Sequence, residues 1–295
     1  MQVGKSDYFQ LHIAVLLFSL CALFAYWVNT GPIHIVFGRT FFASLGLAVL
    51  LAVNPSLTFS SGTIKRRLLI LSSILLVLHW LTFFYAVQQA SVSVALITFA
   101  SYPLWVLFIS LLRGGVVSPW TMLGQALLII LGVALVTWNQ SMTDLTLTTS
   151  GVIAGIVSAM LFAWLTFLNQ TLLVHSSPLS LTFWQNALAS FWLLPFVVFL
   201  PFTGDGLDVA KLLLLGVVFT ALSHTLLLNA MRTVPAFLVS VSVCLEPAYG
   251  ILAAAMLFSE PLTLLVIIGM VLVLISNVWA LKEQQQQPKR LVKSE

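Results

Sequence analysis

The sequence predicts an all-α membrane protein with ten transmembrane helices, arranged as two inverted five-helix repeats. Three observations predict this fold: the composition, the spacing of apolar segments and a repeat between the two halves of the chain. Of the 295 residues, 60% are hydrophobic and only 7% are charged, and the mean hydropathy is +1.10. A soluble fold with this composition would have too few polar groups to cover its surface, so we expect the chain to lie in a lipid bilayer.

Apolar windows of about 20 residues, the length that crosses a bilayer, locate the helices. Short segments with Gly, Pro, Asn or Ser separate them, and only the loops at 54–67 and 139–150 are longer. The predicted helices span residues 9–29, 32–53, 68–88, 91–112, 118–138, 151–172, 178–201, 210–231, 235–258 and 262–281. The first span lacks a small-residue cleavage site, so we interpret it as a retained helix and not as a signal peptide.

Positive charge predicts the orientation, because short translocated loops avoid Lys and Arg. With ten helices, all but two of the basic residues fall on one side of the membrane; they are Lys5, Lys65, Arg66, Arg67, Arg113, Arg232, Lys282, Lys289, Arg290 and Lys293. Lys211 falls on the other side and Arg39 lies inside a span. We therefore expect both termini in the cytoplasm. The same placement in short loops argues against nucleic acid as a partner of the basic residues.

The two halves of the chain repeat one another. Pro103 and Pro247 align at an offset of 144, and Pro32 aligns with Pro178 at an offset of 146. Each half contains five predicted helices, and an odd number forces the second copy to enter the membrane upside down. Proline removes a helical hydrogen bond, so Pro103 and Pro247 are expected to form paired hinges for alternating access.

The repeat divides the chain into three predicted regions. Residues 1–140 form the first repeat, residues 151–281 form the second, inverted repeat, and residues 282–295 form a polar, Gln-rich tail. Composition of this kind predicts a disordered segment, which the charge pattern places in the cytoplasm.

One stretch resembles a known family. The segment LEPAYGILAAAMLFSEPLT, from Leu245 to Thr263, is similar to the pattern of the EamA family in the drug/metabolite transporter superfamily. The segment from Pro32 to Arg39 and the paired glycines Gly124 and Gly269 support the resemblance. It implies a carrier in the bacterial inner membrane that exports small metabolites, commonly amino acids, without ATP. The sequence itself carries no phosphate-binding P-loop motif, which argues against an ATP-driven pump.

Two charged residues fall inside predicted spans. Arg39 lies about 10 Å below the end of its helix, and Glu246 lies about 16 Å along its own, near the midplane. A charge at this depth costs about 3 kcal/mol unless it faces the protein interior or a watery cavity. Arg39 therefore binds an anionic group, forms a gate ion pair or holds a helix end, and Glu246 binds an amine, exchanges a proton or pairs with Arg39. Their repeat partners, Gln185 for Arg39 and Tyr102 for Glu246, are uncharged. We include both as candidate substrate-binding residues.

Histidines and aromatic residues add candidate contacts. His79 and His224 lie in mid-helix, where an imidazole either binds a substrate or is satisfied within the core. Further candidates for a central cavity near the midplane, each with helix packing as its alternative role, are Trp80, Trp105, Trp164 and Asn229.

These residues predict a secondary transporter that exports a small organic metabolite, with an amphipathic amino acid or aromatic compound as the leading expectation. Efflux of lipophilic cations is the alternative on the same fold, and a membrane-embedded enzyme or a non-transporting scaffold are alternatives from other classes. We expect no catalytic residues, metal or cofactor, because no nucleophile, base or metal cluster stands out; Cys21 and Cys244 are interpreted as packing residues. Proton coupling, and the choice between monomer and homodimer, stay open.

Overall fold

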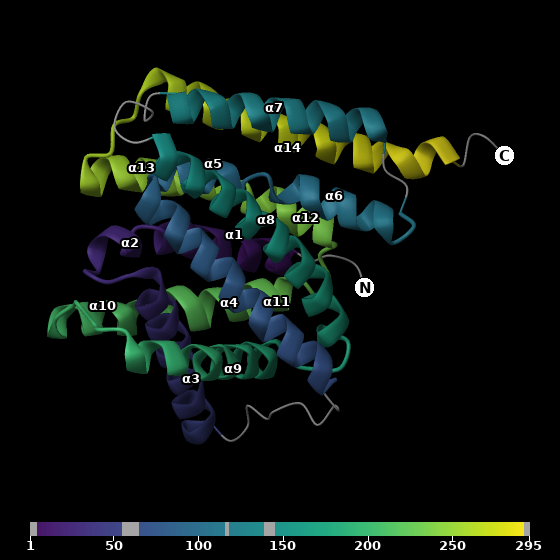
Figure 1. Cartoon of the computed structure of the whole chain (residues 1–295). Coiled ribbons are helices and arrows are strands. Elements are labelled where there is room, and N and C mark those ends of the chain that lie inside the picture. The colour runs from purple at the N-terminus through teal and green to yellow at the C-terminus, as the bar shows by residue number, and fades with distance from the viewer. Residues whose placement is uncertain (1–4, 55–64, 116–117, 139–144, 292–295) are drawn as a thin grey trace.

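Figure 1 shows the computed structural model, in which long helices pack side by side and both chain ends lie at the same end of the molecule. The structure describes residues 5–54, 65–115, 118–138 and 145–291, and within these ranges the regular elements are all helices. Nine helices are long and apolar enough to cross a membrane, and the apolar stretch Leu264–Trp279 supplies a shorter tenth. The chain therefore has the predicted ten-helix fold, with five spans in each inverted repeat.

Two of the five spans in the first half are interrupted. The first span consists of α1 (Lys5–Cys21) and α2 (Phe24–Trp27), and the fourth of α5 (Val92–Phe99) and α6 (Tyr102–Leu112). The other three spans are the continuous helices α3 (Pro32–Val53), α4 (Arg66–Gln89) and α7 (Pro119–Trp138).

The second half also has two spans that are not single α-helices, and it shares with the first half the break in the fourth span. Its first, second and fifth spans are the continuous helices α8 (Leu145–Leu173), α9 (Pro178–Phe199) and α14 (Leu264–Leu291). The third combines α10 (Gly206–Gly216), the π-helix η1 (Val217–Leu222) and α11 (Ser223–Ala230), and the fourth is split into α12 (Ala236–Val243) and α13 (Glu246–Phe258).

The paired prolines follow matching breaks in the fourth span of each half. Pro103 lies in the first turn of α6 and Pro247 in the first turn of α13. At the break before each of them, Ser101 and its repeat partner Leu245 both donate their backbone N–H to the carbonyl three residues back, at 3.1 Å in each case. The same tightened turn therefore occurs at the same repeat position in both halves.

Four helix ends differ from the sequence-based prediction by four residues or more: α1 begins at 5 and not at 9, α8 begins at 145 and not at 151, and the other two have a local explanation. The α10 helix begins at Gly206 and not at 210, because Asp205 and Asp208 form a reciprocal capping box that fixes the helix start. The last helix runs to Leu291, into the segment for which composition predicts disorder. This extension is rich in Gln, Lys and Glu, which are good helix formers and can prolong a helix beyond the membrane.

The main helix pairings join one half of the chain to the other. The most extensively packed pairs are α4 with α8, α7 with α14, α3 with α9 and α1 with α11. Figure 1 shows α7 and α14 side by side along one edge of the molecule. Their backbones approach closely at two glycines, because a Cβ built on Gly132 would lie 2.8 Å from the carbonyl oxygen of Gly269.

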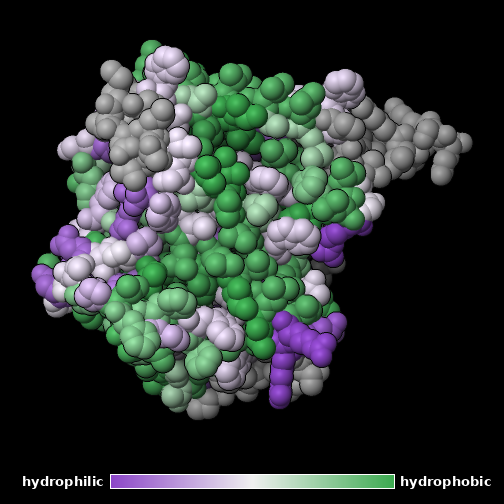
Figure 2. Space-filling model, in the orientation of Figure 1, coloured by the Kyte–Doolittle hydropathy of each residue, from purple (hydrophilic) through white to green (hydrophobic). Residues whose placement is uncertain are grey.

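The outer surface is largely apolar, as a bilayer requires. Figure 2 shows a broad hydrophobic face, with hydrophilic residues gathered toward opposite ends of the molecule. Large side chains such as Phe199 and Met256 are 85% and 84% exposed, respectively. The protein is therefore a multi-pass membrane protein, with lipid as the partner of this surface.

Candidate functional site

A small cavity lies among the broken helices in the middle of the molecule, with a volume of about 40 Å³. Its lining comes from seven of the ten spans. The lining residues are Phe18, Cys21, Arg39, Leu76, His79, Trp80, Phe83, Phe99, Phe162, His224, Leu227 and Glu246. Aromatic rings thus form much of its wall, and one cation, one anion and two imidazoles are the groups able to carry charge.

Arg39 enters this cavity from α3 and is only 1% exposed. Its guanidinium carbon lies 3.8 Å from the centroid of the Trp80 ring, which attracts the cation electrostatically. Nε donates to the hydroxyl of Thr220 at 3.1 Å, and Nη2 lies 3.9 Å from the sulfur of Cys21. The remaining nitrogen, Nη1, makes no hydrogen bond to a described residue, so the side chain is held firmly while one donor end stays free.

The π-helix η1 places Thr220 under Arg39. The Thr220 hydroxyl donates to the carbonyl of Leu215, five residues back, at 2.8 Å. Gly216 lets this segment pack against α3, because a Cβ there would lie 2.5 Å from Cβ of Phe42. Single π-turns are frequent at functional sites. This one joins the third span of the second half to the cation of the first half.

Glu246 enters the cavity from the first turn of α13 and is 5% exposed. The N-terminal end of a helix favours a carboxylate through the helix dipole. No described residue donates a hydrogen bond to this carboxylate. Arg39 and Glu246 both line the cavity, yet no nitrogen of Arg39 lies within 4.0 Å of a Glu246 carboxylate oxygen; among the described residues the ion pair is Lys211 with Asp208. The two opposite charges therefore share the cavity without neutralising each other in a contact pair.

The two cavity histidines have different environments. Nδ1 of His79 lies 3.1 Å from the carbonyl of Ser158 and 2.8 Å from its hydroxyl, so Nδ1 carries the proton that it donates to the carbonyl. The His79 ring also stacks on Phe162, with centroids 4.7 Å apart. His224 is 2% exposed, and neither of its ring nitrogens has a hydrogen-bond partner in the described part of the chain. It contacts the edge of Trp80 at 6.0 Å between centroids. His79 is thus fixed in the wall, whereas His224 has polar atoms available to a ligand.

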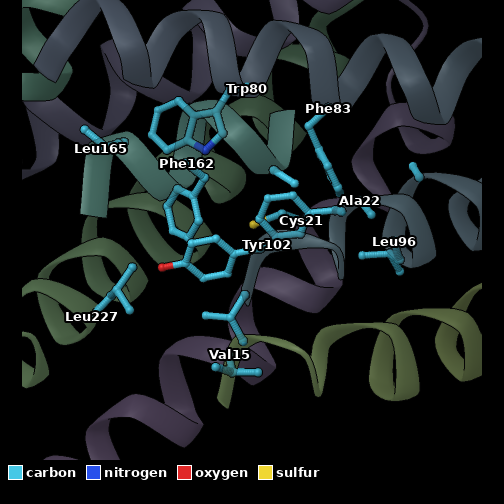
Figure 3. Packing of buried hydrophobic residues seen from close by; sticks show 14 of the residues in the cluster. Val15, Cys21, Ala22, Trp80, Phe83, Leu96, Tyr102, Phe162, Leu165 and Leu227 are labelled. Carbon is cyan, nitrogen blue, oxygen red and sulfur yellow. The ribbon is translucent and has the colours of Figure 1, made fainter. Parts of the chain in front are cut away.

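The repeat partners of the two charged residues lie behind the cavity wall. Tyr102 is fully buried, and its hydroxyl bonds that of Thr166 at 2.6 Å. Gln185 is also fully buried and donates to Ser72 at 2.8 Å and to Asn169 at 2.7 Å. Both residues therefore bind helices to one another, and Figure 3 shows Tyr102 packed beside Phe162 in the apolar core.

Three other candidate residues do not line the cavity. Trp164 is 45% exposed on the outer surface, and Trp105 lies in a separate groove between α6 and α7. Asn229 donates to Gln10 at 2.6 Å and so ties the end of α11 to the start of α1. Of the three tryptophans that we considered for an aromatic cavity, only Trp80 lines it.

Sequence reasoning missed two polar contacts in the cavity. Cys21, interpreted as a packing residue, lines the cavity and donates its thiol to the carbonyl of Phe219 at 3.2 Å. Thr220 holds Arg39, and the available signal was its position four residues before His224, which places both on one helical face.

A latch of polar contacts holds α2 against α10, at the end of the molecule opposite the termini (Figure 1). Nζ of Lys211 donates to the backbone carbonyl of Trp27 at 2.6 Å and to the carboxylate of Asp208 at 2.8 Å. The other carboxylate oxygen of Asp208 accepts the backbone N–H of Asn29 at 3.3 Å. We call Lys211, Asp208 and the Trp27–Asn29 backbone the polar latch.

Comparisons with known proteins agree with this architecture. The EamA-like transporter family matches residues 6–138 and again residues 149–281. An uncharacterized transporter of Archaeoglobus fulgidus is 28% identical over 274 residues, covering 92% of this chain and 94% of that protein. The uncharacterized transporter YxxF of Bacillus subtilis is 26% identical over 251 residues, covering 81% of this chain and 78% of that protein.

One solved crystal structure, whose name states no function, has the same fold. It superimposes with a TM-score of 0.74 at 14% sequence identity, covering 96% of this chain and 98% of that one. With two matched segments that together cover nearly all of the sequence and a cavity enclosed by both, the chain belongs to the EamA-like transporter family.

Proposed function

We propose that the protein is a secondary transporter that exports an amphipathic amino acid by alternating access. The single observation that carries this proposal is the presence of Arg39 and Glu246 in one aromatic cavity without a contact ion pair between them. A zwitterionic ligand presents a carboxylate and an ammonium group, and each would meet its opposite charge there. An apolar or aromatic side chain would lie among the aromatic rings, in space that the small cavity gains when the surrounding helices move apart in alternating access.

Each polar wall residue has a role in this proposal. Arg39 binds the carboxylate through the Nη1 end of its guanidinium, while Thr220 and Trp80 keep the group in place. Glu246 accepts the ammonium group. His224 supplies a hydrogen bond from a nitrogen that otherwise has no described partner. Phe83, Phe99 and Phe162 contact the side chain of the ligand.

The helix breaks supply the movement. Pro103 and Pro247 follow interruptions at equivalent positions, so α6 and α13 can swing about the tightened turns without breaking a regular helix. We propose that the protein lies in a bacterial inner membrane with both termini on the cytoplasmic side, since most of its basic residues fall on the same side of the membrane as the termini. The energy source that we propose is the proton gradient, because a buried carboxylate without a hydrogen-bond donor exchanges one cation for another, here a proton for the ammonium group.

Ligand-induced thermal stabilisation of the detergent-purified protein tests the binding proposal. At least one amphipathic amino acid from a broad panel should raise the melting temperature, because a ligand that binds only the folded state stabilises it by mass action. Arg39→Gln and Glu246→Gln should each lower the affinity for that ligand by about tenfold to a hundredfold, as expected for the loss of a charged hydrogen bond. Trp164→Phe, on the outer surface, is the matched control and should leave the affinity unchanged.

Counterflow in proteoliposomes tests transport by the same site. Amino acids that stabilise the protein should exchange across the vesicle membrane, and an imposed proton gradient should drive net accumulation. If no amino acid in the panel stabilises the protein or exchanges, the substrate class is wrong.

A second candidate function is efflux of lipophilic cations, which the unpartnered Glu246 carboxylate among aromatic rings favours. The two functions make opposite predictions for Arg39. Arg39→Gln removes a charge that repels cations, so it should strengthen the binding of a lipophilic cation. The same substitution should weaken the binding of an amino acid.

A further inference from the structure

A second cavity lies on the lipid-facing surface of the molecule and is separate from the central cavity. It is a groove with a volume of about 400 Å³, and its lining is almost entirely apolar. Its lining residues are Ser101 at the N-cap of α6, Leu104 and Trp105 of α6, and Ile156 of α8, together with Ala126, Ile129, Ile130, Val133 and Ala134 of α7. We call this the α6–α7 groove.

The second half of the chain has a matching groove on α14. Its volume is about 450 Å³, and its lining residues are Val271, Leu274, Ile275, Val278, Trp279 and Lys282. Adding 145, the offset that aligns Gly124 with Gly269, to the five α7 residues of the first groove gives the first five residues of this set. The two grooves therefore occupy the same face of the fifth span in each repeat.

The two grooves differ in polarity. Two residues of the α6–α7 groove, Ser101 and Trp105, carry a hydroxyl and an indole N–H that are buried in the wall and have no hydrogen-bond partner among the described residues. Ser101 is 3% exposed, so water does not surround it. At an offset of 144, the equivalent residues are Leu245 and Tyr249. Leu245 carries no donor, and neither residue lines the second groove.

The depth of the two donors restricts what can satisfy them. In the 21-residue span Val92–Leu112, Ser101 lies about 15 Å from either end, and Trp105 lies about 10 Å from the nearer end. Lipid acyl chains surround the protein at this depth and accept no hydrogen bond. An unpaired donor in such surroundings costs about 1–3 kcal/mol. A bound molecule with an acceptor oxygen removes this cost and therefore binds more tightly than a hydrocarbon of the same size.

We propose that the α6–α7 groove binds a neutral, membrane-dissolved small molecule that carries a carbonyl-type oxygen. The apolar wall of α7 contacts its hydrocarbon part, and the Ser101 hydroxyl and Trp105 indole, which are buried in the wall of the empty groove, turn toward its oxygen and donate to it. This site is separate from the central cavity and does not depend on the transported substrate.

Photolabelling with benzophenone tests the proposal, because benzophenone is neutral and apolar, has one carbonyl oxygen, and inserts into nearby C–H bonds on irradiation. The protein in lipid nanodiscs is irradiated at increasing probe concentrations, and labelled peptides are quantified by mass spectrometry. Labelling of the α6 and α7 peptides should saturate, whereas labelling of the α14 peptides should rise in proportion to concentration. An oxygen-free aryl diazirine of similar size should label both grooves without saturation.

Three variants make the result decisive. Replacing both donors, with Ser101→Ala and Trp105→Phe together, should raise the half-saturating concentration at least about fivefold. Ala134→Phe fills the groove from an exposed position, keeps both donors and should abolish saturation; its repeat equivalent is already a tryptophan, Trp279. Tyr249→Phe is the repeat-related control and should change nothing. Proportional labelling of both grooves would mean adventitious partitioning only, and this outcome, or saturation that survives the double variant, overturns the proposal.

Discussion

The thiol of Cys244 lies 3.6 Å from the backbone carbonyl oxygen of Ala100, and these two residues are equivalents in the repeat. A contact between repeat partners marks the pseudo-twofold axis that relates the two halves. Both residues cap the helix just before a break, Ala100 at the end of α5 and Cys244 at the end of α12. The two breaks are therefore in direct contact with each other.

Replacing the break prolines should slow transport. Pro103→Ala and Pro247→Ala restore a backbone N–H at positions where the helix is interrupted and so favour a straighter, stiffer span. We expect each variant to lower the counterflow rate at least about fivefold, with no loss of ligand binding. Pro195→Ala is the matched control, since Pro195 lies inside the continuous helix α9 and is exposed. If both variants fold correctly and transport at the parental rate, the paired breaks are not hinges.

Removing the aromatic face under Arg39 should weaken ligand binding. Trp80→Leu takes away the ring that lies 3.8 Å from the guanidinium carbon. A buried cation–π contact contributes about 2 kcal/mol, so we expect an affinity loss of about thirtyfold in the thermal-stabilisation assay. Trp164→Leu should have no effect on affinity. An unchanged affinity in Trp80→Leu would mean that Thr220 alone fixes Arg39.

Breaking the polar latch should open the cavity on the side opposite the termini. Lys211→Met removes the donor that joins the carbonyl of Trp27 to Asp208. The buried thiol of Cys21 reports the opening, because it lines the cavity just before α2. A membrane-impermeant maleimide added on that side should modify Cys21 about tenfold faster, as expected for the loss of a charged hydrogen bond.

The position of the label distinguishes opening of the latch from general loosening. Peptide mapping should show the gain at Cys21 and not at Cys244, which is buried outside the cavity lining. Lys282→Met, at the other end of the molecule, should leave the rate unchanged. Equal acceleration at both cysteines would contradict a local latch.

Enlarging the glycines between α7 and α14 should lower stability. A Cβ on Gly269 would lie 2.7 Å from the carbonyl oxygen of Gly132, and this oxygen belongs to the backbone of α7, which cannot move away without separating the helices. We expect Gly269→Ala to cost about 1–3 kcal/mol and to lower the melting temperature in detergent. Gly31→Ala, where no atom lies within 4 Å of the added Cβ, should change it by less than half a kcal/mol. Equal melting temperatures would show that the pair tolerates a wider spacing.

The fold could be read from the sequence because lipid imposes strong rules on it. Apolar length located the spans, and the confirmed ten-helix fold followed from their number. Proline was informative only with its context: Pro103 and Pro247 follow breaks, whereas Pro195 lies within a continuous helix. The single π-helix turn before His224 was not predictable, because it depends on how Gly216 meets α3 in the tertiary structure.

The candidate site was harder to predict, for a reason specific to membranes. Arg39 and Glu246 had to face inward because charge in lipid is costly, and both line the cavity. Tryptophan carries no such restriction. Trp80 faces the cavity and Trp164 faces outward, and apolar periodicity does not separate them because the interior and the lipid are equally apolar.

The pairing of α7 with α14, of α4 with α8 and of α3 with α9 has a consequence for how such a chain arises. Each half packs its most extensive helix faces against the other half. A five-helix unit made alone would therefore expose those faces to lipid. Two copies inserted in opposite orientations would cover them, as a dimer. Joining the copies in one polypeptide turns that association into an intramolecular step at high effective concentration. It also frees each copy to diverge, and the chain places its buried cation in one and its buried carboxylate in the other.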